Sequence, residues 1–264
     1  MKHTRRSPHR IRTRKSVFKK PGFWIFLGIV AFISTLLYFL LFLDYFQVKT
    51  INVFGNEKVS AQDIQSVVLK EVRKNIIFFE SKSIFLASLD RINTNIRKEF
   101  PEINIIKTKR KLFDTVLVTI EERAPVLVLC GLSEEKNLCY YLDNKGVAFE
   151  KMNGGGKGLT IVRQDGSNTP DLGVEVLSPK LTNQIIEIEG SIGKNIGIKE
   201  VNILSDERMD VETAEGWSIY FSLVNEMGLQ LTKLNLLLEK EISKDERNIL
   251  HYIDLRFQDR AYYK

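Results

Sequence analysis

The longest apolar stretch of the chain covers residues 23–43. None of its 21 side chains is charged, and its polar groups are confined to Ser34, Thr35 and the Tyr38 hydroxyl. As a helix with ~1.5 Å rise per residue it would span ~31 Å, which matches a bilayer core of ~30 Å. It has no polar face of the kind that an amphipathic helix of a soluble domain shows. A cleaved signal peptide has a shorter apolar region that ends in small residues, whereas this stretch ends Leu41-Phe42-Leu43. The pattern therefore predicts an uncleaved transmembrane helix.

After this helix, apolar residues alternate between strand and helix spacing up to residue 123. Residues 46–54 are rich in Val, Ile and Phe and end at Gly55-Asn56, which predicts a strand followed by a turn. Two sets of apolar residues then recur every three or four positions and predict two helices. These sets are Ile64, Val67, Val68 and Val72, and then Phe85, Leu89, Ile92 and Ile96. Residues 103–111 and 114–122 read as two further strands, so the expected order is β-α-α-β-β.

From residue 124 onward the pattern is mainly that of strands and turns. Residues 126–130 and 139–142 are expected to pair, and Asp143-Asn144-Lys145-Gly146 is a turn signal before Val147. Residues 151–158 are Gly-rich and predict a loop. Helices are expected at residues 181–192 and around Leu231, Leu234 and Leu238. The remaining strands are expected at residues 198–204, 209–213, 217–223, 249–257 and 261–264.

The charge is distributed unevenly along the chain. Residues 1–22 hold nine basic side chains and no acidic one, whereas the rest has 30 basic and 33 acidic residues, a net charge of −3. Basic flanks of a membrane helix stay in the cytoplasm, so the N-terminus is expected inside and residues 44–264 outside. A basic tail can also bind nucleic acid, but the topology rule and anionic lipids already explain this one, and no nucleic-acid partner is expected.

The two cysteines, Cys130 and Cys139, both lie in the part expected to be exported. They fall at facing ends of two strands that are expected to pair, which brings side chains to disulfide distance. We therefore expect a disulfide that closes a hairpin; two reduced, partly buried thiols remain the alternative.

No catalytic, metal or cofactor site is predicted. The Gly154–Gly158 run lacks the spacing and the hydroxyl residue of a phosphate-binding loop. His251 is the only histidine in the part expected to be exported, so it cannot supply a histidine-based zinc cluster. The paired acids Glu121 and Glu122 point to opposite faces of a strand and cannot act on one substrate together.

Several motifs resemble the FtsQ/DivIB family of bacterial cell-division proteins. The β-α-α-β-β order of residues 44–123 resembles a POTRA domain, the polypeptide-transport-associated module found just outside bacterial membranes. Phe113-Asp114 departs from this pattern, because the family usually has a proline in that turn. The last motif, Asp254-Leu255-Arg256 followed by Arg260-Ala261-Tyr262, resembles the end of the family's β-domain. The other matching motifs are Val53-Phe54-Gly55-Asn56, Phe100-Pro101, Glu122-Arg123-Ala124-Pro125 and Leu142-Asp143-x-x-Gly146-x-x-Phe149.

The resemblance implies an α+β chain in four parts. These are a basic cytoplasmic tail (1–22), one transmembrane helix (23–43), a POTRA domain (44–123) and a C-terminal β-rich domain (124–264). It implies a non-enzymatic scaffold of the division machinery that supports septal peptidoglycan synthesis from the cytoplasmic membrane at the septum. An envelope protein that acts in polypeptide transport or assembly is the alternative.

The resemblance also implies partners and a site. The partners are bitopic proteins of the FtsB/DivIC and FtsL kind, other membrane proteins of the divisome, and membrane lipid. In the family the last strands of the β-domain carry the contact, and exposed strand edges pair readily with a partner strand. The matching positions here are Tyr252, Arg256, Phe257, Asp259 and Ala261.

Overall fold

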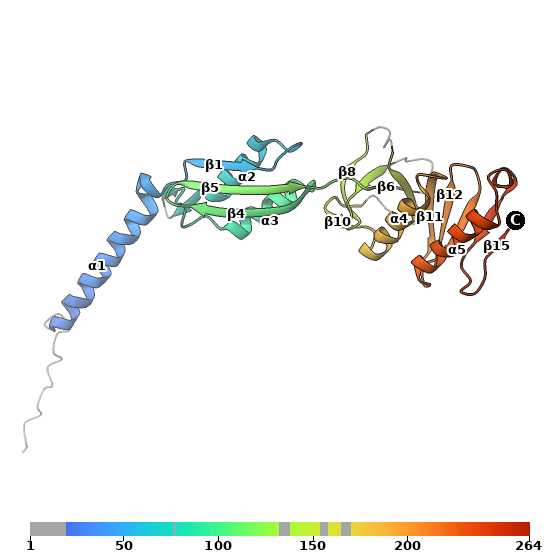
Figure 1. Ribbon diagram of the computed structural model, residues 1–264. Helices are drawn as coiled ribbons and strands as arrows, with labels where there is room; N and C mark the ends of the chain where they lie inside the picture. The colour runs from blue at the N-terminus through green and yellow to red at the C-terminus, as the bar shows by residue number, and fades with distance from the viewer. Residues whose placement is uncertain (1–19, 77, 132–137, 154–157, 165–169) are drawn as a thin grey trace, which may run out of the picture. The chain divides into compact units, whose positions relative to one another are not determined.

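The computed structural model describes residues 20–76, 78–131, 138–153, 158–164 and 170–264 (Figure 1). Within them lie two compact units. The first contains the described part of Met1–Asn52 together with Gln65–Ile92 and Thr108–Leu117. The second contains Val53–Ile64, Asn93–Lys107 and Val118–Lys264. The four-part division expected from the sequence stays a prediction.

The chain begins with one long apolar helix, α1 (Pro21–Phe42), which starts two residues before the expected span and ends one residue before its end. Pro21 stands at its first position, where its missing N–H costs no hydrogen bond. Within the described residues α1 is the one helix long and apolar enough to cross a membrane. None of its residues is buried in the structure, as expected of a helix whose surroundings are lipid.

The next elements are those of the expected small domain, with one addition. The order is η2 (Asp44–Phe46), β1 (Thr50–Phe54), α2 (Ala61–Val72), β2 (Lys74–Ile76), β3 (Phe79–Ser81), α3 (Leu89–Glu99), β4 (Ile103–Lys111) and β5 (Thr115–Glu122). Strands β1, β5 and β4 form a three-stranded sheet, and β2 pairs with β3 in a hairpin that the sequence pattern did not predict. Helix α3 begins at Leu89, so Phe85, which was expected in it, lies before the helix.

A carboxylate fixes the turn between β1 and α2. The Glu122 side chain at the end of β5 accepts hydrogen bonds from the backbone N–H groups of Glu57, Lys58 and Val59 at 2.8–3.0 Å. Burial raises the pKa of the Glu122 carboxyl, but these hydrogen bonds and the charge of Lys58 lower it more, so the pKa lies below its ordinary value. Glu122, from the motif at the end of the small domain, therefore fixes the turn that follows the motif at its beginning, Val53-Phe54-Gly55-Asn56.

The rest of the chain builds a ten-stranded sheet in the order β10-β8-β7-β6-β9-β11-β12-β13-β14-β15. Its strands are β6 (Leu127–Gly131), β7 (Cys139–Leu142), β8 (Val147–Lys151), β9 (Thr160–Gln164), β10 (Val174–Glu175), β11 (Ile198–Ser205), β12 (Arg208–Thr213), β13 (Ser218–Ser222), β14 (Tyr252–Asp254) and β15 (Tyr262–Tyr263). The sequence pattern missed β9 and β10. It also predicted the last strands too long: residues 249–257 and 261–264 were expected, whereas β14 and β15 are shorter and Ile249 ends the short helix η3 (Glu246–Ile249).

Helices α4 (Pro179–Ile192) and α5 (Met227–Lys240) contact each other and pack against the large sheet (Figure 1). Ile185 and Ile188 of α4 and Leu234 of α5 are fully buried in one core with alternate residues of the strands, such as Val211 and Ile219. Side chains that alternate with these point to the opposite face of the sheet. The opposite face of β12, β13 and β14 is therefore available for contacts outside this core.

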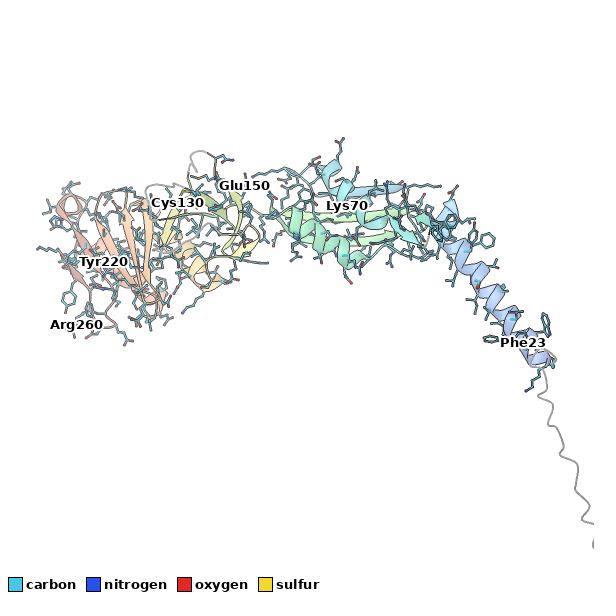
Figure 2. The ribbon with its side chains drawn as sticks, turned by 180° about the vertical axis from the view of Figure 1, so that it is seen from behind. Phe23, Lys70, Cys130, Glu150, Tyr220 and Arg260 are labelled. Atoms are coloured by element: carbon cyan, nitrogen blue, oxygen red, sulfur yellow. A yellow bond between two sulfur atoms is a disulfide. The ribbon has the colours of Figure 1, made fainter. Side chains whose placement is uncertain are left out.

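Cys130 and Cys139 face each other in the register of β6 and β7 and are joined by a disulfide. Both are buried and form a small cluster with Val128, against which Tyr141 and Ile161 pack. Figure 2 shows Cys130 in the large sheet. The Gly-rich loop expected at 151–158 lies partly outside the described residues.

Candidate partner-binding edge

The last strand, β15, ends the large sheet on one side. It pairs antiparallel with β14, with Ile253 opposite Tyr263 and Asp254 opposite Tyr262. Lys264 and Tyr252 exchange backbone hydrogen bonds, with N–O distances of 3.2 and 3.3 Å. Because such bonds alternate along an antiparallel pair, the N–H and C=O groups of Tyr263 point away from β14. The sheet thus ends in a short strand with backbone groups turned to the outside.

The open face beside this edge carries a cluster of charged and aromatic side chains. We define the open-face cluster as Arg208, Asp210, Tyr220, Tyr252, Asp254 and Arg256. The rings of Tyr220 and Tyr252 stack with centroids 5.4 Å apart and planes 17° apart. The guanidinium groups of Arg208 and Arg256 lie 4.9 and 5.6 Å from the centre of the Tyr220 ring. These distances are within the range of cation–π attraction.

Each arginine of the cluster is also fixed by a carboxylate two residues away. Arg256 donates from Nε and Nη2 to the two oxygens of Asp254 at 2.9 and 2.6 Å. Arg208 donates in the same way to the two oxygens of Asp210, both at 2.8 Å. Residues two apart on a strand share a face, so both pairs lie on the open side of the sheet. The fork geometry holds the planar guanidinium groups still against the tyrosine ring between them.

Burial raises the pKa of the Asp254 carboxyl, because only 6% of this residue is exposed. The hydrogen bonds from Arg256 and the positive charges of Arg256 and Arg208 lower it more, so the pKa of Asp254 lies below its ordinary value. Asp254 therefore stays ionised and keeps Arg256 in place at neutral pH.

The five residues expected at the partner contact have different surroundings. Tyr252 and Arg256 belong to the open-face cluster. Phe257 is 44% exposed and meets the ring of Tyr262 edge to face at 5.2 Å. Asp259 lies in the exposed connection before β15 and forms an ion pair with its neighbour Arg260. Ala261 is half buried and packs against the core of the sheet, so its side chain contributes to folding.

Tyr220, Arg208 and Asp210 were not expected at the site from the sequence, and Asp254 was known only as part of the Asp254-Leu255-Arg256 motif. The sequence does show that these residues share one face of their strands, because charged and aromatic residues alternate with buried ones along β12 and β13. The pairing of distant strands, which brings Tyr220 beside Tyr252 and Asp254, could not be read from that alternation.

The peptide between β14 and β15 is held by neighbouring side chains. The Lys233 ammonium group of α5 donates to the carbonyl oxygens of Phe257 at 2.5 Å and Gln258 at 3.0 Å. The Asn225 amide donates to the carbonyl of Arg256 at 2.7 Å. Phe257 is therefore presented on a connection whose backbone is fixed from the α5 side.

No group of three or more histidine, cysteine or acidic residues that could hold a metal ion occurs in the part of the chain that the structure describes. The geometry of the edge suits the binding of another polypeptide, with outward backbone groups for strand pairing and exposed aromatic rings beside them.

The fold defines a membrane-anchored POTRA protein with a sheet-rich C-terminal region. Residues 46–123 match the family described as "POTRA domain, FtsQ-type". The chain is also similar to "Cell division protein FtsQ" of Streptomyces venezuelae, with 20% identity over 219 residues, or 81% of this chain and 76% of that protein. The chain is a cell-division protein with an FtsQ-type POTRA domain. Both comparisons confirm the resemblance that the sequence motifs indicate.

Proposed function

We propose that this protein is a non-enzymatic scaffold of the division machinery, held in the cytoplasmic membrane by α1, with its basic tail inside and residues 44–264 outside. Nine basic side chains before α1 and Asp44 directly after it support this orientation, since basic flanks are retained in the cytoplasm. The scaffold supports septal peptidoglycan synthesis by holding other division proteins at the septum.

Its partners are bitopic division proteins of the FtsB/DivIC and FtsL kind, and the contact is made at the β15 edge. The observation that carries this proposal is the open edge itself. The backbone of Tyr263 faces outward, while Phe257, Tyr262 and the open-face cluster surround it with exposed rings and fixed arginines. Strand addition supplies backbone hydrogen bonds, and aromatic and arginine side chains supply most of the energy of such interfaces.

Depletion of the protein in growing cells, followed by microscopy, tests the function. We expect filaments without septa, and restoration of septation by the parent chain. Septation at the normal frequency after depletion would contradict the proposal. A reporter active only outside the cytoplasm, fused after Lys264, tests the orientation and should be active there, whereas a fusion near Lys15 should be inactive.

A further inference from the structure

Side-chain hydrogen bonds join the C-terminal end of α1 to the end of β3 and the residues directly after it. The hydroxyl groups of Ser81 and Ser83 donate to the carbonyl oxygens of Leu41 and Leu40 at 2.5 and 2.9 Å. The Gln47 amide donates to Leu41 O at 2.8 Å. The last carbonyls of a helix have no partner within the helix, so these bonds satisfy them. Both serines are buried, and all five residues belong to the first compact unit.

These hydrogen bonds fix the depth at which the surface around β3 lies relative to the membrane. The 22 residues of α1 span ~33 Å, slightly more than a bilayer core of ~30 Å. Leu41 therefore lies at the boundary between acyl chains and headgroups. The ring of Phe79 contacts the ring of Phe42, with centroids 6.0 Å apart, so the β2–β3 hairpin lies at the same level.

Large apolar side chains are exposed at this level. We define the membrane-proximal rim as Tyr45, Phe78, Phe79, Leu112 and Phe113, which are 55%, 91%, 67%, 58% and 43% exposed. They come from three separate segments: η2, the β2–β3 hairpin and the β4–β5 turn. The ring of Tyr45 lies 4.7 Å from that of Phe113 and so joins two of these segments. A soluble domain rarely gathers so many exposed aromatic residues without an apolar partner.

Basic side chains stand next to the rim. Lys109, Arg110 and Lys111 are all exposed and lead directly into the Leu112-Phe113 turn. The one acidic residue of that turn, Asp114, accepts a hydrogen bond from the Thr115 hydroxyl. Aromatic rings with adjacent basic groups are the combination that binds the interfacial layer of a membrane with anionic lipids.

We propose that the membrane-proximal rim inserts into the headgroup layer of the leaflet in which α1 ends, and that Lys109 and Lys111 bind anionic headgroups there. The bilayer is the occupant because the rim continues the apolar surface of α1, through the contact of Phe42 with Phe79. The proposal rests on α1 as the membrane span. Insertion attaches the small domain to the bilayer at several points. The orientation of this domain relative to the bilayer therefore does not depend only on the connection after α1.

Spin labels on the full chain in lipid nanodiscs test this placement. A nitroxide is attached to Phe78→Cys or Leu112→Cys, and as a matched control to Val224→Cys, an equally apolar position that is 69% exposed between β13 and α5. Circular dichroism first verifies that each variant is folded. Accessibility to oxygen, which concentrates in lipid, is then compared with accessibility to a water-soluble nickel chelate.

We expect oxygen to reach the labels at positions 78 and 112 better than the nickel chelate does, and the reverse at position 224. Nickel accessibility at 78 and 112 equal to that at 224 would overturn the proposal. Protection that appears only when two chains share a nanodisc would also overturn it, because a second copy would then be the occupant. No division partner is present, so the result is independent of partner binding at the β15 edge.

The headgroup contact has its own test in nanodiscs of phosphatidylcholine with or without phosphatidylglycerol. The double variant Lys109→Glu/Lys111→Glu should raise nickel accessibility at position 112 severalfold in the anionic lipid and much less in pure phosphatidylcholine. Lys145→Glu/Lys151→Glu changes the net charge equally at exposed positions of the large sheet and should have no effect. Equal changes in both lipids would show that Lys109 and Lys111 do not bind anionic headgroups.

Discussion

Arg256 donates three hydrogen bonds to the carboxylate of Asp254, two from its guanidinium group and one from its backbone N–H. Asp254 is almost fully buried, whereas Arg256 reaches the open face of the sheet beside Tyr220. A buried carboxylate on the open face of the sheet thus determines the position of an arginine on the proposed binding surface.

The Asp254–Arg256 pair should make stability depend on pH. The pKa of Asp254 is depressed in the folded state, so its contribution is present above the unfolded-state pKa of about 3.9 and is lost as the pH falls below that value. We expect the free energy of unfolding to fall more steeply between about pH 5 and about pH 3 for the parent than for Asp254→Asn/Arg256→Gln. Urea titration, followed by the fluorescence of the buried Trp217, measures the free energy of unfolding at each pH. Identical slopes for the parent and the double variant would contradict the prediction.

Arg256→Ala alone should destabilise the large sheet by about 1–3 kcal/mol at pH 7, because it leaves the buried Asp254 carboxylate without its main partner. The double variant of the preceding paragraph should recover part of this loss. The same urea titration checks both. A loss in the double variant as large as that in Arg256→Ala would show that the pair is not coupled.

Phe257→Ala should weaken binding of an FtsB/DivIC-kind partner by about 1–2 kcal/mol, since an exposed ring beside an open edge has the properties of an interface hot spot. Leu229→Ala on α5 removes another exposed apolar side chain, 61% exposed against 44% for Phe257, and should bind as the parent does. Titration calorimetry measures the affinities and circular dichroism the folding. If folded Phe257→Ala binds with the parent's affinity, the docking surface lies elsewhere.

Deletion of residues 259–264 should abolish partner binding, but it is a weaker test than Phe257→Ala. Ala261 packs against the core, and Lys264 bonds to His251 and Tyr252, so the deletion also removes stabilising contacts.

The disulfide between Cys130 and Cys139 should stabilise the large sheet by about 2–3 kcal/mol, since it closes a short loop in the unfolded chain. The comparison is between the parent and Cys130→Ser/Cys139→Ser, with the Trp217 urea titration as the readout. Mass spectrometry after alkylation without reduction should find neither thiol labelled in exported protein. Labelling of both would contradict the prediction.

Gly55 and Gly216 offer a matched pair of substitutions to alanine. Both have positive φ angles, +82° and +95°, which an L residue adopts at a cost of about 1 kcal/mol or more. A Cβ at Gly55 would lie 2.2 Å from the backbone oxygen of Ile120, whereas nothing lies within 4 Å at Gly216. Gly55→Ala should therefore lower the thermal midpoint, measured by circular dichroism, clearly more than Gly216→Ala. An equal effect would mean that the β1–α2 turn moves away from β5 without cost.

Features that depend on neighbouring residues could be predicted from the sequence. An uncharged run of 21 residues indicates a membrane helix regardless of what surrounds it, because the length matches the bilayer. Residues 103–111 were predicted as a strand with the bounds that β4 has, since alternation is a local property. The expected pairing of residues 126–130 with 139–142 also corresponds to the observed β6–β7 hairpin.

Features that depend on contacts between distant segments could be seen only in the folded chain. Strands β9 and β10 and the β2–β3 hairpin are short, and hydrogen bonds to neighbours far along the chain or around a tight turn define them. The open-face cluster arises because β13 pairs in parallel with β14, more than thirty residues later, which places Tyr220 beside Asp254. The membrane-proximal rim gathers side chains from three segments that no periodicity connects. The local pattern of the sequence indicates which side of a helix or strand a residue occupies, but the packing of helices and strands determines which residues contact one another.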